Sequence, residues 1–255
     1  MDKASLRPFF TVVVATFNAD KTIGRCLESL LAQTELAEIV VIDGASTDAT
    51  VACVMPFVGQ GRVRFLTEPD RGVFDAWNKG VDLSSGRWII FIGGDDYYKD
   101  EEALRKLRFQ LEQTPEEVVL AYPSINLVNS SGAFLRKENK AWSLCCSTLH
   151  SNMPFTHTGT AHRRSIFTER KFDPSYRVCG DYHFLFPLLS AQVPLFIPEY
   201  VVEMTDGGLS NDPKSRVRLI REILSVHFAY KTSVPLRVKI YLRAKLFYFK
   251  IRSLI

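Results

Sequence analysis

The stretch Arg87-Trp88-Ile89-Ile90-Phe91-Ile92-Gly93-Gly94-Asp95-Asp96 decides the fold of this chain. Its apolar run predicts a strand buried on both faces, which ends in two glycines and two adjacent carboxylates. Neighbouring carboxylates repel each other and resist desolvation unless a cation or the hydroxyls of a ligand satisfy them. Open α/β sheets bind ligands at the carboxyl ends of their strands. The pair therefore predicts a divalent metal held for a phosphate-bearing substrate; a plain Gly-Gly-Asp-Asp turn is the alternative.

Strands and helices alternate through the first hundred residues. Apolar, β-branched runs predict strands at 10–15, 39–42, 63–66 and 88–92, and helical spacing of apolar residues predicts helices at 21–33 and 74–83. Strand-helix-strand units with crossovers of this length pair their strands in parallel. The pattern predicts an α/β fold with a doubly wound, mostly parallel sheet flanked by helices.

The rest of the chain has weaker signals. We expect helices at 101–113, 164–172 and 182–189, strands at 118–122 and 194–203, and an irregular region at 124–151 that contains a turn at 129–132. Asp212 with Pro213, and Ser233 with Pro235, predict the starts of two further helices. The chain is accordingly divided into residues 1–100, residues 101–211 of the same domain, and a helical C-terminal extension, 212–255.

Composition bounds the class of protein. The 255 residues are 46% hydrophobic, which suits one large α/β domain with an appendage. The five cysteines are odd in number and include no CxxC pair, so they are expected to be reduced thiols in a cytosolic protein. The first residues lead directly into a strand, so we expect no signal peptide. No run of about eighteen apolar residues predicts a membrane span.

Positive charge is concentrated at the C-terminus. From Pro213 onward the chain carries eleven Lys or Arg and one acid, Glu222, whereas the rest has a net charge of −6. The helix expected after Pro235 has two apolar stripes, Leu236-Ile240-Phe247-Ile251-Leu254 and Val238-Leu242-Leu246-Phe249. One stripe is expected to pack on the domain, and the other to meet an anionic membrane surface. Ordinary helix packing, or contact with a partner chain in a homo-oligomer, is the alternative. Nucleic acid is not expected, because no recognised binding motif accompanies the charge.

Polar clusters follow all four of the first predicted strands. They are Thr16-Phe17-Asn18, Asp43-Gly44-Ala45-Ser46-Thr47-Asp48, Glu68-Pro69-Asp70-Arg71-Gly72 and Asp95-Asp96. Because the carboxyl ends of parallel strands lie along one edge of a sheet, these clusters are expected to converge on one crevice. Each cluster alone is a weak signal, and the four together indicate a ligand site.

These motifs resemble the family 2 glycosyltransferases, particularly bacterial enzymes of O-antigen, capsule and exopolysaccharide assembly. The resemblance rests on 41–48, on 68–80 and on Gly94-Asp95-Asp96; it is dense over residues 9–98 and traceable to about residue 210. It implies the GT-A fold, with residues 1–100 as the nucleotide-sugar-binding half and 101–211 as the acceptor-binding and catalytic half. Gly93-Gly94 departs from the family pattern, in which a bulkier residue often precedes the acids.

The resemblance also implies roles for individual residues. Asp96 matches the carboxylate that holds Mn²⁺ or Mg²⁺ on the donor diphosphate, and a hard cation bridging two phosphates needs few protein oxygens. The nucleotide would be bound by Thr16, Asn18, Asp43 (on the base), Asp70, Arg71 and Asp95 (near the ribose). Gly72, Asp75 and Asn78 would shape the donor pocket. The segment 206–210 resembles a mobile loop that orders on donor binding in this family.

The catalytic base is predicted from a second motif. Cys179-Gly180-Asp181-Tyr182 resembles the acidic motif of the family, with Gly180 in a place that often carries another acid. Asp181 would take the proton of the acceptor hydroxyl. Its structural alternative is a helix N-cap. His157 resembles a histidine near the acceptor or diphosphate, and a purely structural role is the alternative.

Together these residues predict an inverting, metal-dependent glycosyltransferase. It would transfer a sugar from a nucleoside-diphosphate donor to a saccharide acceptor, which could be lipid-linked, at the cytoplasmic face of the plasma membrane. A sugar-phosphate nucleotidyltransferase is one alternative. Such an enzyme would need a glycine-rich, basic loop after the first strand, and residues 15–20 do not form a loop of that composition. A catalytically inactive, membrane-associated scaffold that binds nucleotide sugars is the other.

Overall fold

The computed structural model describes residues 7–59, 61–207 and 213–252. The strands are β1 Phe10–Thr16, β2 Glu38–Asp43, β3 Val63–Thr67, β4 Trp88–Gly93, β5 Leu120–Val128, β6 Phe134–Glu138, β7 Ala161–Arg163 and β8 Leu195–Thr205. The longer helices are α1 Ile23–Leu31, α2 Thr50–Val58, α3 Val73–Leu83, α4 Ala103–Glu112, α7 Gly180–Ala191, α8 Pro213–Ala229 and α9 Leu236–Arg252. Short helices occur at α5 Trp142–Cys145 and α6 Ile166–Glu169.

One twisted sheet contains all of these strands. Its order is β3-β2-β1-β4-β7-β5-β6, and β8 pairs with β5. The four N-terminal strands are parallel, as are β5 and β8, while β7 and β6 run antiparallel to their neighbours. The predicted α/β class with a mostly parallel sheet is confirmed. The division at residue 100 remains a prediction, because both halves share this sheet.

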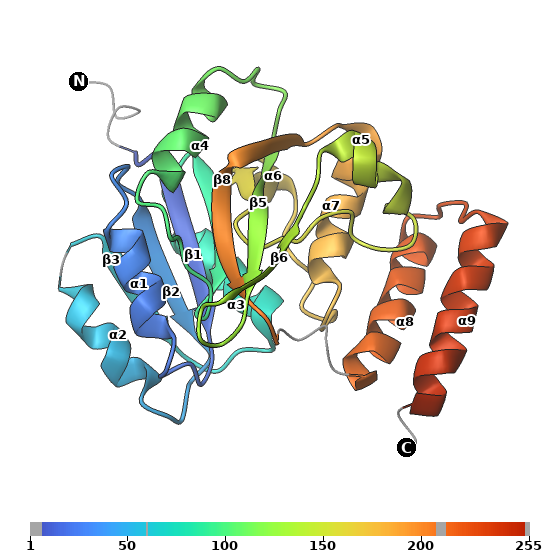
Figure 1. Ribbon diagram of the computed structural model, residues 1–255, viewed down its shortest axis with the longest axis horizontal. Helices are drawn as coiled ribbons and strands as arrows, with labels where there is room; N and C mark the ends of the chain where they lie inside the picture. Colours follow the sequence, from blue (N-terminus) through green and yellow to red (C-terminus); the bar gives the residue numbers. More distant parts are fainter. Residues whose placement is uncertain (1–6, 60, 208–212, 253–255) are drawn as a thin grey trace.

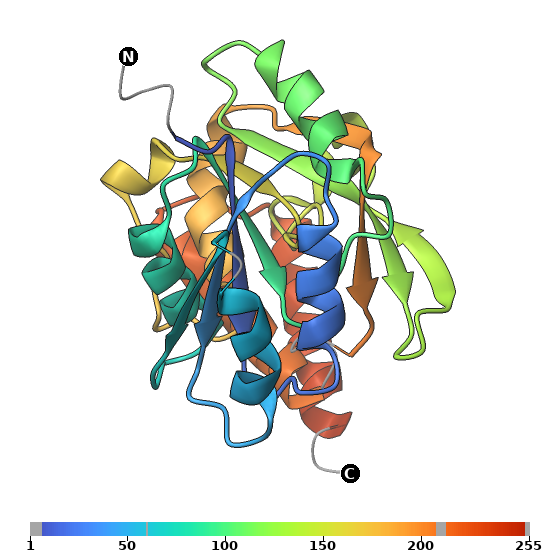
Figure 2. The same cartoon turned by 90° about the vertical axis from the view of Figure 1, so that its left-hand side faces the viewer.

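Helices cover both faces of the sheet (Figures 1 and 2). Side chains of α1, α2 and α4 join one core cluster, whereas those of α3, α7, α8 and α9 join the other. β4 serves both clusters, because alternate residues such as Trp88 and Phe91 point to opposite faces. The two-sided burial predicted from its apolar run is therefore confirmed.

Several expected elements differ in the structure. The region 124–151 is not irregular, since β5 continues to Val128 and forms a hairpin with β6. Because β6 is an edge strand with exposed side chains, it lacks the alternating pattern that sequence reasoning needs. α2 was not expected, because its apolar residues are consecutive and it contains Pro56. Only residues 166–169 of the helix expected at 164–172 are helical.

The C-terminal helices form an antiparallel pair beside α7 (Figure 1). Leu242 of α9 is fully buried, and Val238, Leu246 and Phe249 pack against the same core cluster. The first apolar stripe is exposed at Leu236, Ile240 and Phe247, and its other two members, 251 and 254, have no described side chain. In the described part of the chain, no helix has the length and apolar content that a bilayer crossing needs. Asp212, expected to cap α8, lies outside the described residues.

Two helical glycines give a matched test of the packing between α3 and β1. A Cβ on Gly80 of α3 would lie 2.3 Å from Cγ1 of Val13, whereas a Cβ on Gly24 of α1 would meet nothing within 4 Å. Gly80→Ala should lower the free energy of unfolding by about 1–3 kcal/mol through overpacking. Gly24→Ala should raise it by about 0.5–1 kcal/mol, because alanine favours the helix. Denaturant unfolding followed by circular dichroism measures both, and equal effects would contradict the close approach.

Candidate functional site

The four polar clusters meet at the carboxyl edge of the parallel strands. In the β-ladder Thr16 pairs with Asp43, Asp43 pairs with Thr67, and Ala15 pairs with Gly93. The strands therefore end in register, and the polar residues that follow them lie along one edge of the sheet. The predicted convergence on this edge is confirmed, and a ligand crevice there stays a prediction.

Side chains tie the first two clusters to each other. Oδ1 of Asn18 accepts a hydrogen bond from the N–H of Thr47 at 2.9 Å, and the N–H of Asn18 donates to Oγ of Ser46 at 2.8 Å. Asn18 adopts a left-handed backbone conformation with φ 50°, which asparagine tolerates better than most residues. Thr16 is buried, and its hydroxyl has no protein partner. The crossed bonds hold both loops rigidly at the edge of the sheet.

Asp43 lies beneath this surface. Its carboxylate is fully buried and accepts hydrogen bonds from the N–H of Ser46 at 2.9 Å, from the hydroxyl of Ser46, and from the hydroxyl of Thr67 at 2.7 Å. The structure thus shows Asp43 holding the loop after β2 to the end of β3. Its contact with a nucleotide base remains a prediction.

The third cluster forms the entry to α3. Oδ1 of Asp70 accepts the N–H of Gly72 at 2.8 Å, and Asp75 accepts the N–H of Arg71 at 3.0 Å and pairs with its guanidinium at 3.3 Å. Gly72 has φ 112°, a conformation that favours glycine. Arg177 donates to the carbonyl of Arg71, so the segment before α7 is joined to this turn. Arg71 itself is exposed toward solvent and remains available to a ligand.

Asn78 does not present a free amide to the donor pocket. Its Nδ2 donates to the carbonyl of Phe172 at 2.8 Å, and its Oδ1 accepts the N–H of Phe172 at 3.0 Å. Both ends of the amide are therefore used in fixing the 170–174 segment to α3. The same tertiary tie explains why the helix expected at 164–172 stops at residue 169. Asn78 therefore supports the fold through its side chain, and its part in shaping the donor pocket stays a prediction.

The two carboxylates after β4 are packed closely. Asp96 is 4% exposed and accepts the N–H groups of Gly93 at 3.0 Å and of Thr205 at 3.3 Å. Burial raises the pKa of both acids, and the negative charge of Asp95 raises that of Asp96 further. A Cβ on Gly93 would stand 2.6 Å from a carboxylate oxygen of Asp95. The departure from the family pattern at 93 thus has a steric reason.

The donor set suits a hard divalent cation bound largely through a ligand. Two adjacent carboxylates whose ionisation is opposed by burial are a site that a cation would stabilise. Among the described residues, no group of three or more His, Cys, Asp or Glu could hold a metal by itself. A diphosphate and water would have to supply the remaining oxygens, as Mn²⁺ and Mg²⁺ bound to nucleotides generally require.

Asp181 begins α7 beside a large cavity. Its Oδ1 accepts the N–H of Tyr182 at 2.8 Å. Burial raises the pKa of Asp181 to about 6, and the nearby charge of Glu222 contributes, while the N–H of Tyr182 opposes the shift. A carboxylate with a pKa near neutrality can accept a proton during a reaction more effectively than an ordinary aspartate.

Glu222 is a site residue that sequence reasoning missed. From α8, its carboxylate accepts the N–H groups of Arg177 at 3.0 Å, Val178 at 2.9 Å and Cys179 at 2.8 Å. These three N–H groups precede the first turn of α7, so Glu222 fixes the start of the helix that carries Asp181. The only sign of this role in the sequence is that Glu222 is the one acid among eleven basic residues from Pro213 onward.

The cavity beside Asp181 lies between the domain and the C-terminal helices. Its volume is about 810 Å³, and its lining includes Asp181, His157, Lys140 and, from α8 and α9, Arg216, Tyr241, Lys245 and Phe249. Glu138, the other acid of the lining, pairs with Arg136 at 2.6 Å. The cavity therefore combines aromatic walls with an excess of cations.

His157 connects the cavity to the carboxylate pair. It is 5% exposed, stacks on Trp77, and its Nε2 lies 3.1 Å from Nε2 of His162. Burial lowers its pKa well below the ordinary value, so the ring is neutral. Its Nδ1 has no protein partner. The adjacent Thr158 hydrogen-bonds Asp96, so a short segment separates the two halves of the site. Of the loop expected at 206–210, residues 208–210 lie outside the described part.

Known proteins support the same reading of the fold and chemistry. The sequence model described as glycosyl transferase family 2 matches residues 11–174. A PGL/p-HBAD biosynthesis glycosyltransferase of Mycobacterium tuberculosis is 30% identical over 80% of each chain. The succinoglycan biosynthesis protein ExoO of Rhizobium meliloti is 30% identical over 80% of this chain and 63% of its own.

A solved structure shares the fold. It is the mannosyltransferase PcManGT from Pyrobaculum calidifontis in complex with GDP-Man and Mn²⁺, which has a TM-score of 0.65 and 19% identity over 95% of this chain and 70% of its own. This likeness confirms the GT-A fold. From the carboxyl-edge motifs, the matched residues and these relatives it follows that the chain is a glycosyltransferase and belongs to glycosyl transferase family 2.

Proposed function

We propose that the chain is an inverting, metal-dependent glycosyltransferase that moves a sugar from a nucleoside-diphosphate donor to a lipid-linked saccharide in cell-surface polysaccharide biosynthesis. One observation carries the proposal. The Asp95-Asp96 pair and the cavity of Asp181 are joined by the 157–158 segment, in which Thr158 contacts Asp96 and His157 lines the cavity. A donor bound at the carboxyl edge would thus have its sugar directed toward an acceptor in the cavity.

The reaction is a single displacement at the anomeric carbon. Asp181 accepts the proton of the acceptor hydroxyl as its oxygen bonds to that carbon, and the bond to the diphosphate breaks on the opposite face. One displacement inverts the configuration. A divalent ion, held by Asp96 when bound, offsets the charge that grows on the departing nucleoside diphosphate. Asp95 and Arg71 are assigned to the ribose and base of the donor.

The acceptor proposal rests on the chemistry of the cavity. Lys140, Arg216 and Lys245 would attract a phosphate, and Tyr241 and Phe249 offer flat apolar surface for a sugar ring or the start of a lipid chain. His157 also lines this cavity, with its Nδ1 buried and without a protein partner, and its contact with the acceptor stays a prediction. These features favour a phosphate-linked saccharide over a neutral one.

A membrane location for the acceptor agrees with the exposed side of α9. Ile240 is 60% and Phe247 69% exposed, and Arg237, Lys239 and Arg243 are exposed on the same helix. Apolar side chains beside cations favour an anionic lipid surface. We therefore propose peripheral attachment at the cytoplasmic face of the membrane.

The metal role of Asp96 can be tested by an isosteric change. Asp96→Asn should keep the fold, since the amide oxygen can still accept one of the two N–H groups that bond Asp96, but lower sugar transfer about a hundredfold or more. Mn²⁺ binding in the presence of nucleoside diphosphate, measured by electron paramagnetic resonance, should weaken in parallel. Asp95→Asn is the matched control and should retain more Mn²⁺ binding. If Asp95→Asn loses the ion and Asp96→Asn keeps it, the two roles are reversed.

The base role of Asp181 predicts a pH dependence. The base acts when deprotonated, so transfer efficiency (kcat/KM) should rise with pH through a pKa of about 6 and then level off. Asp181→Asn should abolish this rise and lower transfer by about a hundredfold to ten-thousandfold.

The N-cap of α7 is Cys179, so the structural role of Asp181 is its hydrogen bond to the N–H of Tyr182 within the first turn. Asparagine keeps this bond, so the unfolding of Asp181→Asn should be close to that of the unsubstituted chain. Full activity with an unchanged pH profile would reduce Asp181 to this structural contact.

The membrane proposal is tested by vesicle sedimentation. Replacing Ile240 and Phe247 with glutamate should lower binding to phosphatidylglycerol vesicles at least tenfold, because apolar insertion is lost and negative charge is added. Phe109→Glu is the matched control, since Phe109 is 63% exposed on the distant α4 and should have no effect. Unchanged vesicle binding in the double variant would contradict the proposal. A concentration-dependent dimer that the same substitutions dissolve would instead make this face a homo-oligomer interface.

A further inference from the structure

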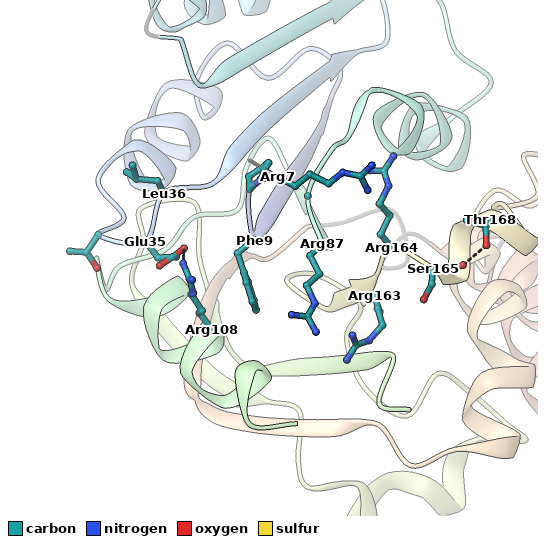
Figure 3. A pocket seen from close by; sticks show the side chains of 13 residues that line it. Arg7, Phe9, Glu35, Leu36, Arg87, Arg108, Arg163, Arg164, Ser165 and Thr168 are labelled. Atoms are coloured by element: carbon teal, nitrogen blue, oxygen red, sulfur yellow. Dashed lines mark hydrogen bonds and ion pairs between the residues drawn. The ribbon is translucent and has the colours of Figure 1, made fainter. Parts of the chain in front are cut away.

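A groove lined by arginines lies at the edge of the sheet opposite the proposed donor site (Figure 3). Its volume is about 1140 Å³, and it is formed by the segment before β1, the turn before β4, α4, and the end of β7 with the start of α6. β1 and β4 begin at this groove, whereas Asp95 and Asp96 follow the far end of β4. The proposed transfer reaction makes no use of it.

The lining is strongly positive. It contains Glu35 as its single acid and five arginines, Arg7, Arg87, Arg108, Arg163 and Arg164. Glu35 is already paired with Arg108 at 2.7 Å, and Arg108 also pairs with Glu112 at 2.8 Å. Apart from Glu35, the lining contains no carboxylate that could pair with the other four arginines.

Two of the four guanidinium groups are held in place. Arg163 donates from Nε to the carbonyl of Val118 at 3.1 Å, and its guanidinium lies 4.8 Å from the centre of the Trp88 ring. Arg164 donates from Nη1 to the carbonyl of Ser84. The carbonyl contacts orient the guanidinium groups without neutralising their positive charge, and at Arg163 the charges of Glu116 and Glu117 offset part of it. Preorganised donors of this kind lose little conformational entropy on binding an anion.

The other two arginines have no such partners. Within the described residues, the guanidinium groups of Arg7 and Arg87 make no hydrogen bond or ion pair, and Arg87 is 5.8 Å from the centre of the Phe9 ring. Figure 3 shows the four guanidinium groups as two pairs: that of Arg7 is turned toward that of Arg164, and those of Arg87 and Arg163 lie together on the other side of the groove. Burial and then the charge of Arg87 lower the pKa of Arg163, while Glu116 and Glu117 oppose the shift. Two like charges that interact in this way favour an anion bound between them.

We propose that the arginine groove is a second ligand site, which binds the phosphate groups of a ligand through two arginine pairs, Arg7 with Arg164 and Arg87 with Arg163. A guanidinium group can donate two parallel hydrogen bonds to two oxygens of one phosphate. Such charge-assisted hydrogen bonds are stronger than bonds between neutral groups. The exposed hydroxyl of Ser165 lines the same groove and adds a neutral donor. The phosphate can belong to a soluble molecule or to a lipid headgroup.

Calorimetric titration with inorganic tripolyphosphate tests the site. The buffer contains EDTA, so that no divalent ion supports binding at Asp96. The unsubstituted chain should bind, and Arg7→Ala and Arg87→Ala should each weaken binding about tenfold, the loss of one charge-assisted bond. Both side chains make no internal bond, so the fold should be unaffected. Arg105→Ala is the matched control, because Arg105 is exposed on α4 and pairs with Glu102 outside the groove.

Two further arms identify the source of the phosphate and separate the two sites. Asp96→Asn should bind tripolyphosphate as well as the unsubstituted chain does. Phosphatidylglycerol vesicles are then presented to the Ile240→Glu, Phe247→Glu chain, in which α9 no longer contributes. Vesicle binding that Arg87→Ala abolishes assigns a lipid headgroup, whereas tripolyphosphate binding alone assigns a soluble phosphate. Absence of both, or equal weakening by Arg105→Ala, overturns the site.

Discussion

Two negative charges are buried side by side after β4, and much of the surrounding chain is arranged to tolerate them. Burial penalises the charged form of both acids, and their mutual repulsion adds to that penalty. The N–H groups of Gly93 and Thr205 and the side chain of Thr158 offset part of the cost at Asp96. These donors come from β4, the end of β8 and the segment before β7. These hydrogen bonds to Asp96 can form only when β4, β8 and the segment before β7 have come together in the folded sheet.

The same requirement connects distant parts of the chain. β8 pairs with β5 in parallel, and its last residue, Thr205, reaches the carbonyl of Asp95 through its hydroxyl at 2.7 Å. α8 follows β8 and returns Glu222 to the start of α7. The C-terminal extension is therefore part of the site, because without it three N–H groups ahead of Asp181 would lack an acceptor. An unsatisfied buried donor costs about 1–3 kcal/mol.

The polar edge of the parallel strands could be predicted from the sequence, and the cavity beside Asp181 only in part. Residues 9–98 alternate regularly between strand and helix, so the ends of β1 to β4 and their polar residues follow from local pattern alone. The role of Asn78 could not be predicted, because its partner is the backbone of Phe172, 94 residues away in sequence. β6 lacks the alternating pattern of a strand because it is an exposed edge strand. α2 lacks the helical spacing of apolar residues because nearly all of its residues are apolar. Glu222 was visible only as an isolated acid; its three partners depend on tertiary packing.

The two apolar stripes of α9 could be predicted from the sequence, but which of them packs on the domain could not. Both are apolar, but among the side chains that the structure describes, those of Val238, Leu242, Leu246 and Phe249 meet the core, because α8 and α7 offer a surface to that side. Phe249 then does more than pack, since Arg216 lies over its ring at 5.4 Å and both line the Asp181 cavity. A substitution that shifts α9 would therefore alter the acceptor wall and the start of α7 together. Ile240 and Phe247 of the other stripe are exposed. Burying them against lipid would contribute about 1.5–3 kcal/mol for each side chain. In the proposed membrane-bound state, that gain would orient the cavity toward the lipid surface, where a lipid-linked acceptor would be found.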